Sequence, residues 1–307
     1  MNILRKIFFS VVFCLLGIAT FMACDPTQEA FQDRKSRDNS IDIKAYIAAN
    51  KLTGSDSTLD GLFYIVKNIN PKGQIPQVGD ELTISYMARR LDGVLVDSNS
   101  NFIYIRAPFN SGNSYKFLPV PSIEELMYPG VEKLREGDQV TLFVPWTLRN
   151  TGSGSLLAPL YIPLKYDIVI KNVRTEDEQI KDYFKAAKII PTEIAKNGIH
   201  FTKTLVNKDS AAVKVGETVQ TIYTGRFARS GGEFDAGVLN VALIDTVATA
   251  TGGSVVKGFN AGIYRMRYGE KAVIGFPSAL GYGTSGSGTK IPAFAPLVFE
   301  IQVLRIK

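Results

Sequence analysis

The sequence predicts an α+β protein with two copies of one domain, each an antiparallel twisted sheet wrapped on one short helix. Three observations support this prediction. Short segments of the first half recur in the second half, each half contains runs of alternating apolar and polar residues, and each contains one stretch in which apolar residues follow a helical spacing. This pattern favours an antiparallel sheet with a helix on its face over a parallel βαβ arrangement.

The duplication is visible as matched residues at a constant offset. Tyr86 and its neighbours recur around Tyr223, and later in each copy Pro145 recurs as Pro277 at a slightly shorter offset. An offset that changes only in the middle of the repeat indicates one fold with loops of different length.

The copies define the expected organisation of the chain. Residues 25–40 are polar and mixed in charge, which is typical of a flexible tether. The predicted segments are a leader peptide, residues 1–24; a tether, residues 25–40; a first copy, residues 41–174; and a second copy, residues 175–307.

The N-terminal segment has the features of a targeting peptide. Arg5 and Lys6 precede an apolar run at residues 7–19, and the run ends in Ala23 and Cys24. A small residue before a cysteine resembles a bacterial lipobox, so we expect acylation of Cys24 and a lipid-anchored membrane protein of the cell envelope, facing the periplasm or the cell surface. An uncleaved anchor helix is the alternative, and either places the remaining chain outside the cytoplasm.

The composition excludes several kinds of chemistry. The only cysteines, Cys14 and Cys24, lie in the leader, so the remaining chain has no thiol for a disulfide, a zinc knuckle or a nucleophile. The single histidine, His200, is too few for an HExxH zinc site, and we expect it to be an ordinary strand residue. The formal net charge of +6 is scattered and forms no basic stripe. We therefore expect no metal, no cofactor and no nucleic-acid partner.

Each copy has the same expected order of elements. A short amphipathic helix opens each copy, at residues 41–50 and 178–188, and two strands follow. The next helix has its apolar residues on one face. These residues are Ile123, Leu126, Met127, Val131 and Leu134 in the first copy, and Val255, Phe259, Ile263 and Met266 in the second. The expected closing strands are residues 139–145 and 161–173, then 271–277 and 297–307.

Six motifs of the second copy follow one another in a characteristic order. They are Ile222-Tyr223-Thr224-Gly225, Glu233-Phe234-Asp235, Val255-Val256-Lys257-Gly258-Phe259, Gly281-Tyr282-Gly283, Lys290-Ile291-Pro292 and Leu297-Val298-Phe299-Glu300. Together they resemble the FKBP-type peptidyl-prolyl cis-trans isomerase family. The resemblance covers residues 198–307 well and the first copy only in outline.

The resemblance implies a role for each matched residue. The implied catalytic residues are Tyr223, Asp235 and Tyr282. The implied substrate-binding residues are Phe234, Val255, Val256, Phe259, Ile291 and Phe299. Phe259 replaces the usual tryptophan at the pocket floor, and residues 241–250 contain no aromatic residue where the family places one.

These residue types suit rotation about an X–Pro amide. The barrier is about 18–20 kcal/mol because the twisted amide loses its resonance. The twisted amide is also less dipolar, so a dry aromatic pocket favours it over water, and no nucleophile or metal is needed. The uncatalysed step takes tens to hundreds of seconds and can limit folding. The resemblance therefore implies an isomerase, or rotamase, that acts as a folding catalyst or chaperone on proline-containing unfolded or exported polypeptides. A non-catalytic binding or scaffolding lipoprotein of the envelope is the alternative.

The first copy departs from the family pattern. Tyr86 and Asp97 keep their places, but Val96 stands at the phenylalanine position and Met127 at the aromatic floor. The loop after Pro145 has no Gly-Tyr-Gly motif. We therefore expect a degenerate FKBP-like domain that serves in packing, substrate holding or partner contact.

Overall fold

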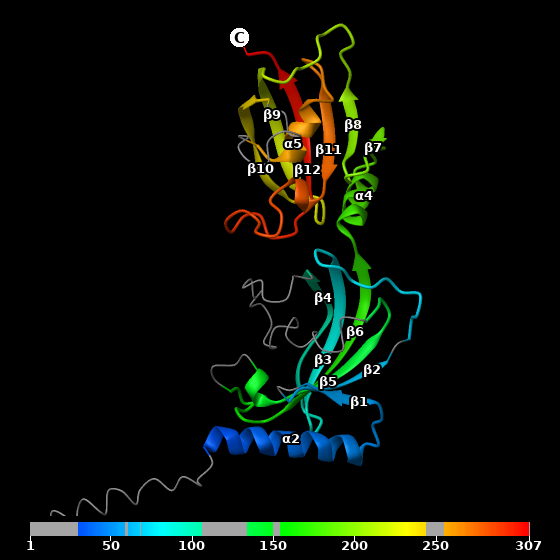
Figure 1. The fold of residues 1–307 in the computed structure, drawn as a ribbon, viewed down its shortest axis with the longest axis vertical. Coiled ribbons are helices and arrows are strands. Elements are labelled where there is room, and N and C mark those ends of the chain that lie inside the picture. The colour runs from blue at the N-terminus through cyan, green and yellow to red at the C-terminus, as the bar shows by residue number, and fades with distance from the viewer. Residues whose placement is uncertain are drawn as a thin grey trace, which may run out of the picture.

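Two antiparallel sheets, placed end to end, form most of the described protein (Figure 1). The computed structural model describes residues 30–58, 61–67, 69–105, 134–149, 154–243 and 255–306. The expected leader with Cys24, the first residues of the tether and most of the predicted helix around Met127 lie outside these ranges.

The first sheet has the strand order β1-β2-β5-β6-β3-β4, and all neighbouring strands are antiparallel. Its strands are β1 (Ser55–Ser57), β2 (Phe63–Lys67), β3 (Glu81–Arg90), β4 (Leu95–Ile105), β5 (Gln139–Val144) and β6 (Leu164–Arg174). The alternating pattern of β3, β5 and β6 buries one face, on which Leu82, Ile84 and Leu142 are fully covered. A short 3-10 helix, η1 (Trp146–Leu148), follows β5.

The second sheet repeats this topology. Its order is β10-β9-β12-β11-β8-β7, which equals the first order when read from the opposite edge. Its strands are β7 (Glu193–Ile194), β8 (His200–Leu205), β9 (Thr218–Phe227), β10 (Glu233–Ala242), β11 (Lys271–Phe276) and β12 (Leu297–Leu304). All pairings are antiparallel. The predicted α+β class, with one antiparallel sheet for each copy, is confirmed.

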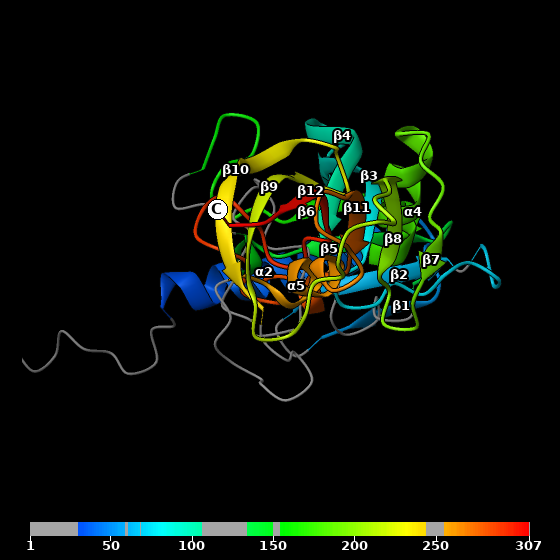
Figure 2. The same ribbon diagram turned by 90° about the horizontal axis from the view of Figure 1, so that it is seen from above.

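The second sheet curves around one short helix, α5 (Lys257–Ile263), as the view along the long axis shows (Figure 2). The helix packs against β11 and β12. A glycine permits this close approach, because a Cβ atom at Gly258 would lie 2.3 Å from the ring of Phe276. The 3-10 helix η2 (Ser278–Leu280) follows β11.

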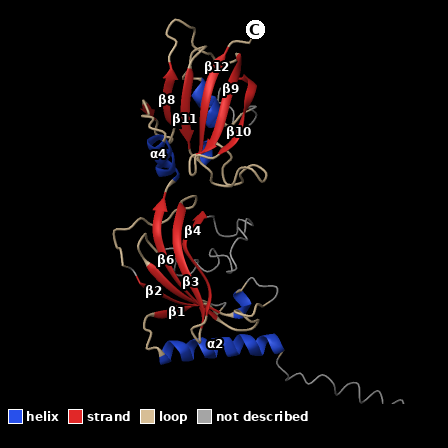
Figure 3. Cartoon of the chain, turned by 180° about the vertical axis from the view of Figure 1, so that it is seen from behind, coloured by secondary structure: helices blue, strands red, loops and turns tan. Residues whose placement is uncertain are grey.

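Helix α4 (Glu176–Ala186) lies beside β8 and β11 near the junction of the two copies (Figure 3). It begins two residues before the predicted start, because Thr175 caps the helix and exchanges hydrogen bonds with Glu178 in a capping box. Its residues Ile180 and Phe184 are buried against the outer face of the second sheet. The predicted boundary between the copies stays a prediction, and β6 ends just before α4 begins.

Helix α2 (Phe31–Ala49) corrects the predicted tether. Residues 31–40 are helical and continuous with the opening helix expected at residues 41–50. Packing accounts for the difference. The ring of Phe31 meets Tyr161 edge-on at 5.1 Å, and the buried Asn39 donates a hydrogen bond of 2.9 Å from its amide to the carbonyl of Tyr161. Contacts with a residue 122 positions away are not visible in the local composition.

Within the described residues, no helix combines the length and the apolar character that a membrane crossing requires.

Candidate active site

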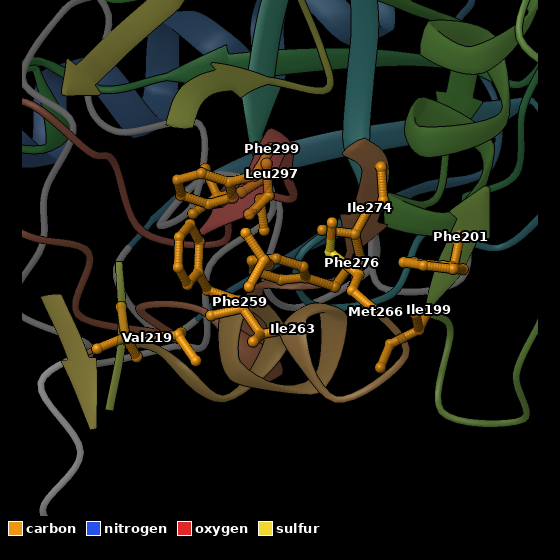
Figure 4. Close-up of a cluster of buried hydrophobic side chains, with 14 of the residues drawn as sticks. Ile199, Phe201, Val219, Phe259, Ile263, Met266, Ile274, Phe276, Leu297 and Phe299 are labelled. Atoms are coloured by element: carbon orange, nitrogen blue, oxygen red, sulfur yellow. The ribbon is translucent and has the colours of Figure 1, made fainter. Parts of the chain in front are cut away.

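An aromatic cluster lies between helix α5 and the second sheet. Phe299 of β12 is at its centre, with ring centroids 5.0 Å from Phe259, 5.6 Å from Phe234, 5.8 Å from Phe276 and 6.2 Å from Tyr223. Figure 4 shows the ring of Phe259, which comes from α5, beside that of Phe299, which comes from the sheet. The edge-to-face geometry of Phe299 with Phe234 and with Phe259 is the arrangement that aromatic quadrupoles favour. The resulting cluster is apolar, and its four phenylalanines are buried.

A hydrogen-bonded pair borders this cluster. The hydroxyl of Tyr223 on β9 donates to the carboxylate of Asp235 on β10 at 2.9 Å. The register brings them together, because Tyr223 lies opposite Gly237, two residues beyond Asp235, and diagonal neighbours on antiparallel strands share a face. Asp235 is exposed, whereas the ring of Tyr223 packs edge-on against Phe259 at 5.7 Å. The pair thus lies at the rim of the aromatic cluster.

A second phenol lies near the same carboxylate. Burial, and then the charge of Asp235, raise the pKa of Tyr282, which lies just after η2 and stays 37% exposed. Burial and the hydrogen bond to Asp235 also raise the pKa of Tyr223. Since a tyrosine ordinarily ionises near pH 10, both phenols remain protonated donors at neutral pH. Tyr282 is therefore a partly exposed phenol near Asp235.

The remaining predicted residues complete the same cluster. Val255 and Val256 are half-buried against it, and Val256 is the N-cap residue directly before α5. Ile291 is buried, and its backbone pairs with Ser287 through two hydrogen bonds of 2.8 and 3.1 Å. The structure thus brings the predicted residues together around one aromatic centre. Their roles in binding and catalysis stay predictions. Val241 joins this core, whereas residues 244–250 lie outside the described ranges.

Sequence reasoning missed Gly225 as a member of the site. A Cβ atom at Gly225 would lie 2.7 Å from a ring atom of Phe234 and 2.7 Å from a ring atom of Phe299. The two rings therefore occupy the space that a side chain on β9 would fill. A glycine inside an alternating strand is the signal that could have found it.

The first copy keeps the polar pair of the second copy. The hydroxyl of Tyr86 donates to Asp97 at 2.8 Å. Unlike Tyr223, Tyr86 is nearly fully buried, and it meets the ring of Phe102 edge-on at 6.3 Å. The pair of the first copy is therefore less accessible to a polypeptide.

The aromatic centre of the first copy is altered. Ala88 on β3 lies opposite Tyr166 on β6, in the same way that Gly225 lies opposite Phe299 in the second sheet. Tyr166 is buried, and burial raises its pKa to about 12. Arg149 lies near it, inside the protein, and donates to three backbone carbonyls of residues 158–162. In the first copy, Tyr166 thus stands at the position of Phe299, and the methyl group of Ala88 stands at the position of Gly225.

His200 lies in β8, as predicted, and its side chain is buried. Its Nε2 atom lies 2.7 Å from the carboxylate of Asp177 on α4. Among the residues that the structure describes, no three His, Cys, Asp or Glu side chains gather in a way that could hold a metal ion.

Comparison with known proteins places this site in a family. The sequence model of the family described as "FKBP-type peptidyl-prolyl cis-trans isomerase" matches residues 209–304. FK506-binding protein 1A of Aspergillus fumigatus is 37% identical over 94 residues, which are 30% of this chain and 80% of that protein. The chain belongs to the FKBP-type peptidyl-prolyl cis-trans isomerase family, as its motifs predicted.

Other relatives also match this chain. Peptidyl-prolyl cis-trans isomerase FKBP2 of mouse is 39% identical over 93 residues, and the chain covers 64% of that protein's length. Among solved structures, the three FKBP domains of wheat FKBP73 are 18% identical, with a TM-score of 0.38 over 82% of this chain and 98% of that chain. FkpA from Escherichia coli is 26% identical, with a TM-score of 0.36 over 43% of this chain and 59% of that chain.

Proposed function

We propose that this protein is a peptidyl-prolyl cis-trans isomerase whose second copy binds and isomerises X–Pro bonds of exported or envelope polypeptides. The observation that carries the proposal is the aromatic cluster around Phe299 with two protonated phenols, Tyr223 and Tyr282, at its rim. A proline ring suits such an apolar surface, and a phenol suits the carbonyl oxygen of the preceding residue.

The chemistry follows from the unequal polarity of the planar and the twisted amide. The twisted amide has lost its resonance and part of its dipole, so an apolar surface such as that of Phe259 and Phe299 disfavours the planar state relative to the twisted one. The hydroxyl of Tyr282 donates a hydrogen bond to the substrate carbonyl and holds that side while the proline side rotates. Asp235 accepts a hydrogen bond from the hydroxyl of Tyr223 and fixes the orientation of its ring. No covalent bond forms or breaks.

The activity is tested on the full chain with a proline-containing chromogenic tetrapeptide. The parent protein is expected to accelerate cis-trans isomerisation, and Tyr282→Phe is expected to lower kcat/KM about tenfold, the effect of losing one hydrogen bond of roughly 1–1.5 kcal/mol. Tyr268→Phe is the control, because Tyr268 is a tyrosine of the same copy that is not one of the predicted site residues and whose hydroxyl bonds Glu217 at 3.1 Å. Equal rates for parent and Tyr282→Phe would contradict the role of this phenol.

The alternative function is a non-catalytic FKBP-like binding or scaffolding module. The altered centre of the first copy, with Ala88 and Tyr166, favours such a role for that copy. A well-folded full chain that binds the proline peptide without accelerating its isomerisation would establish this alternative for the whole protein.

We further propose that the protein is a lipid-anchored lipoprotein of the cell envelope. Support comes from the sequence alone: Arg5 and Lys6 precede an apolar run that ends in Ala23 and Cys24. In a bacterial host, metabolic labelling with radioactive palmitate is expected to mark the parent and not Cys24→Ala, with Cys14→Ala retaining the label. Equal labelling of parent and Cys24→Ala would overturn the assignment of the lipidated cysteine.

A further inference from the structure

The first copy contacts a loop of the second copy that carries two residues of the candidate site. We call residues 281–296 the site loop; it connects η2 to β12 and contains Tyr282 and Ile291. Ile105, at the end of β4, forms a small buried apolar cluster with Ala293 and Phe294 of this loop. These contacts join residues that are almost 190 positions apart in the sequence.

The burial of Ile105 depends on this contact. Residues two positions apart on a strand point to the same face. Ile103 is 55% exposed, whereas Ile105 is only 9% exposed. The site loop therefore covers one residue of this face of β4 and leaves its neighbour open, which provides a matched pair for experiment.

Phe294 has a constrained position in this contact. Its backbone φ of 54° lies in the left-handed region, which is costly for a bulky residue and persists only where the surroundings enforce it. Gly79 of the first copy lies directly against its ring, because a Cβ atom at Gly79 would be 3.3 Å from a ring carbon. The first copy thus contacts Phe294 through Gly79 and contacts both Ala293 and Phe294 through Ile105.

Hydrogen bonds connect this contact to Tyr282. The backbone N–H of Phe294 donates to the carbonyl of Gly283 at 3.0 Å, and Gly283 is the direct neighbour of Tyr282. The N–H of Gly283 donates in turn to the carbonyl of Ser278 at 2.8 Å. Glu176 of α4 accepts two hydrogen bonds of 2.6 Å from Ser278, one from its backbone N–H and one from its hydroxyl. Hydrogen bonds therefore hold the backbone of Gly283, next to Tyr282, to Phe294 on one side and to Ser278 on the other.

A buried ion pair holds the two copies at this junction. Glu81 of β3 is only 4% exposed, and its carboxylate lies 2.6 Å from Arg174 and 2.5 Å from Arg229, which comes from the turn after β9. Arg229 also lines a cleft with Pro292, Ala295 and Pro296 of the site loop. Because a buried carboxylate is stabilised by its cationic partners, the contact of Glu81 with Arg229 resists separation of the copies.

We propose that the first copy is a positioning element for the site of the second copy, with Ile105 and Phe294 fixing the place of Tyr282. The proposal rests on the proposed function for the identity of the site. It assigns a use to a copy whose own aromatic centre is altered. Ile105 and Gly79 of this copy contact the site loop, so that the phenol is oriented before substrate binds. Such preorganisation raises affinity by reducing the ordering that binding requires.

The test compares Ile105→Ala and Ile103→Ala in the full chain. In the Ile105→Ala variant, the amides of Phe294 and Ile291 are expected to exchange with solvent about tenfold faster, the equivalent of ~1.4 kcal/mol of lost local stability. KM for the proline tetrapeptide is expected to rise several-fold, with kcat kept, because the loop must then be ordered on binding. Ile103→Ala is expected to change neither quantity.

A second variant guards against a folding defect of the first copy. Phe294→Ala removes the same contact from the other side, and it is expected to reproduce the faster exchange of the Ile291 amide. Unchanged exchange at Ile291 in both Ile105→Ala and Phe294→Ala would overturn the proposal. Hydrogen exchange does not depend on activity, so a parent protein without isomerase activity would contradict the proposed function and still leave the positioning contact decided by the exchange result.

Discussion

Replacing Phe299 by alanine is expected to lower the free energy of unfolding of the second copy by about 3–5 kcal/mol, the range for removing a buried phenylalanine. Phe299 is 5% exposed and lies at the centre of four aromatic rings, so no neighbouring side chain can refill its space without leaving its own position. The same change removes the apolar floor of the candidate site. Binding of a proline peptide is therefore expected to be lost together with stability.

Urea unfolding followed by far-UV circular dichroism measures this effect. The single tryptophan, Trp146, lies in the first copy, so its fluorescence reports on that copy separately. Val238→Ala is the control: its side chain is 61% exposed on β10 of the same sheet, and its removal is expected to cost less than about 0.5 kcal/mol. A Phe299→Ala variant as stable as Val238→Ala would show that the aromatic cluster does not hold this copy together.

Placing a single methyl group at Gly225 is expected to abolish isomerisation. The added Cβ would lie 2.7 Å from ring atoms of Phe234 and Phe299, closer than real Cβ atoms approach carbon. Both rings must move to admit it, and overpacking of this kind costs about 1–3 kcal/mol. Unlike Phe299→Ala, this change keeps every aromatic side chain and alters only their arrangement.

Gly237→Ala is the matched control for Gly225→Ala. Gly237 is also a strand glycine, in the adjacent β10, but its added Cβ would meet Tyr223 only at an ordinary 3.8 Å. Thermal unfolding and kcat/KM of both variants are compared with the parent. We expect Gly237→Ala to stay within about 0.5 kcal/mol of the parent. Equal activity of Gly225→Ala and the parent would show that the ring positions do not matter for catalysis.

Much of the fold was predictable because it depends on local and periodic information. Alternation along β3, β9 and β12 marks their buried faces, and the recurrence of Tyr86 as Tyr223 indicates that one topology occurs twice. The grouping of Tyr223, Asp235 and Phe299 followed from the family motifs, which record side chains that meet in space.

The tether was mispredicted for the opposite reason. Residues 31–40 have the polar composition of a linker, and their helical state depends on contacts of Phe31 and Asn39 with Tyr161. Composition describes only neighbours along the chain, and a distant partner that satisfies a buried amide is invisible to it.

The sequence by itself therefore determined the fold class, the duplication and the family, since periodicity and motifs are written in neighbouring residues. Only the tertiary structure decided that Gly225 leaves room for two rings and that Ile105 and Phe294 meet between the copies. The physical reason is that packing is a property of surfaces brought together by the whole chain. A residue's burial depends on what covers it, and for Ile105 that cover lies in the other copy.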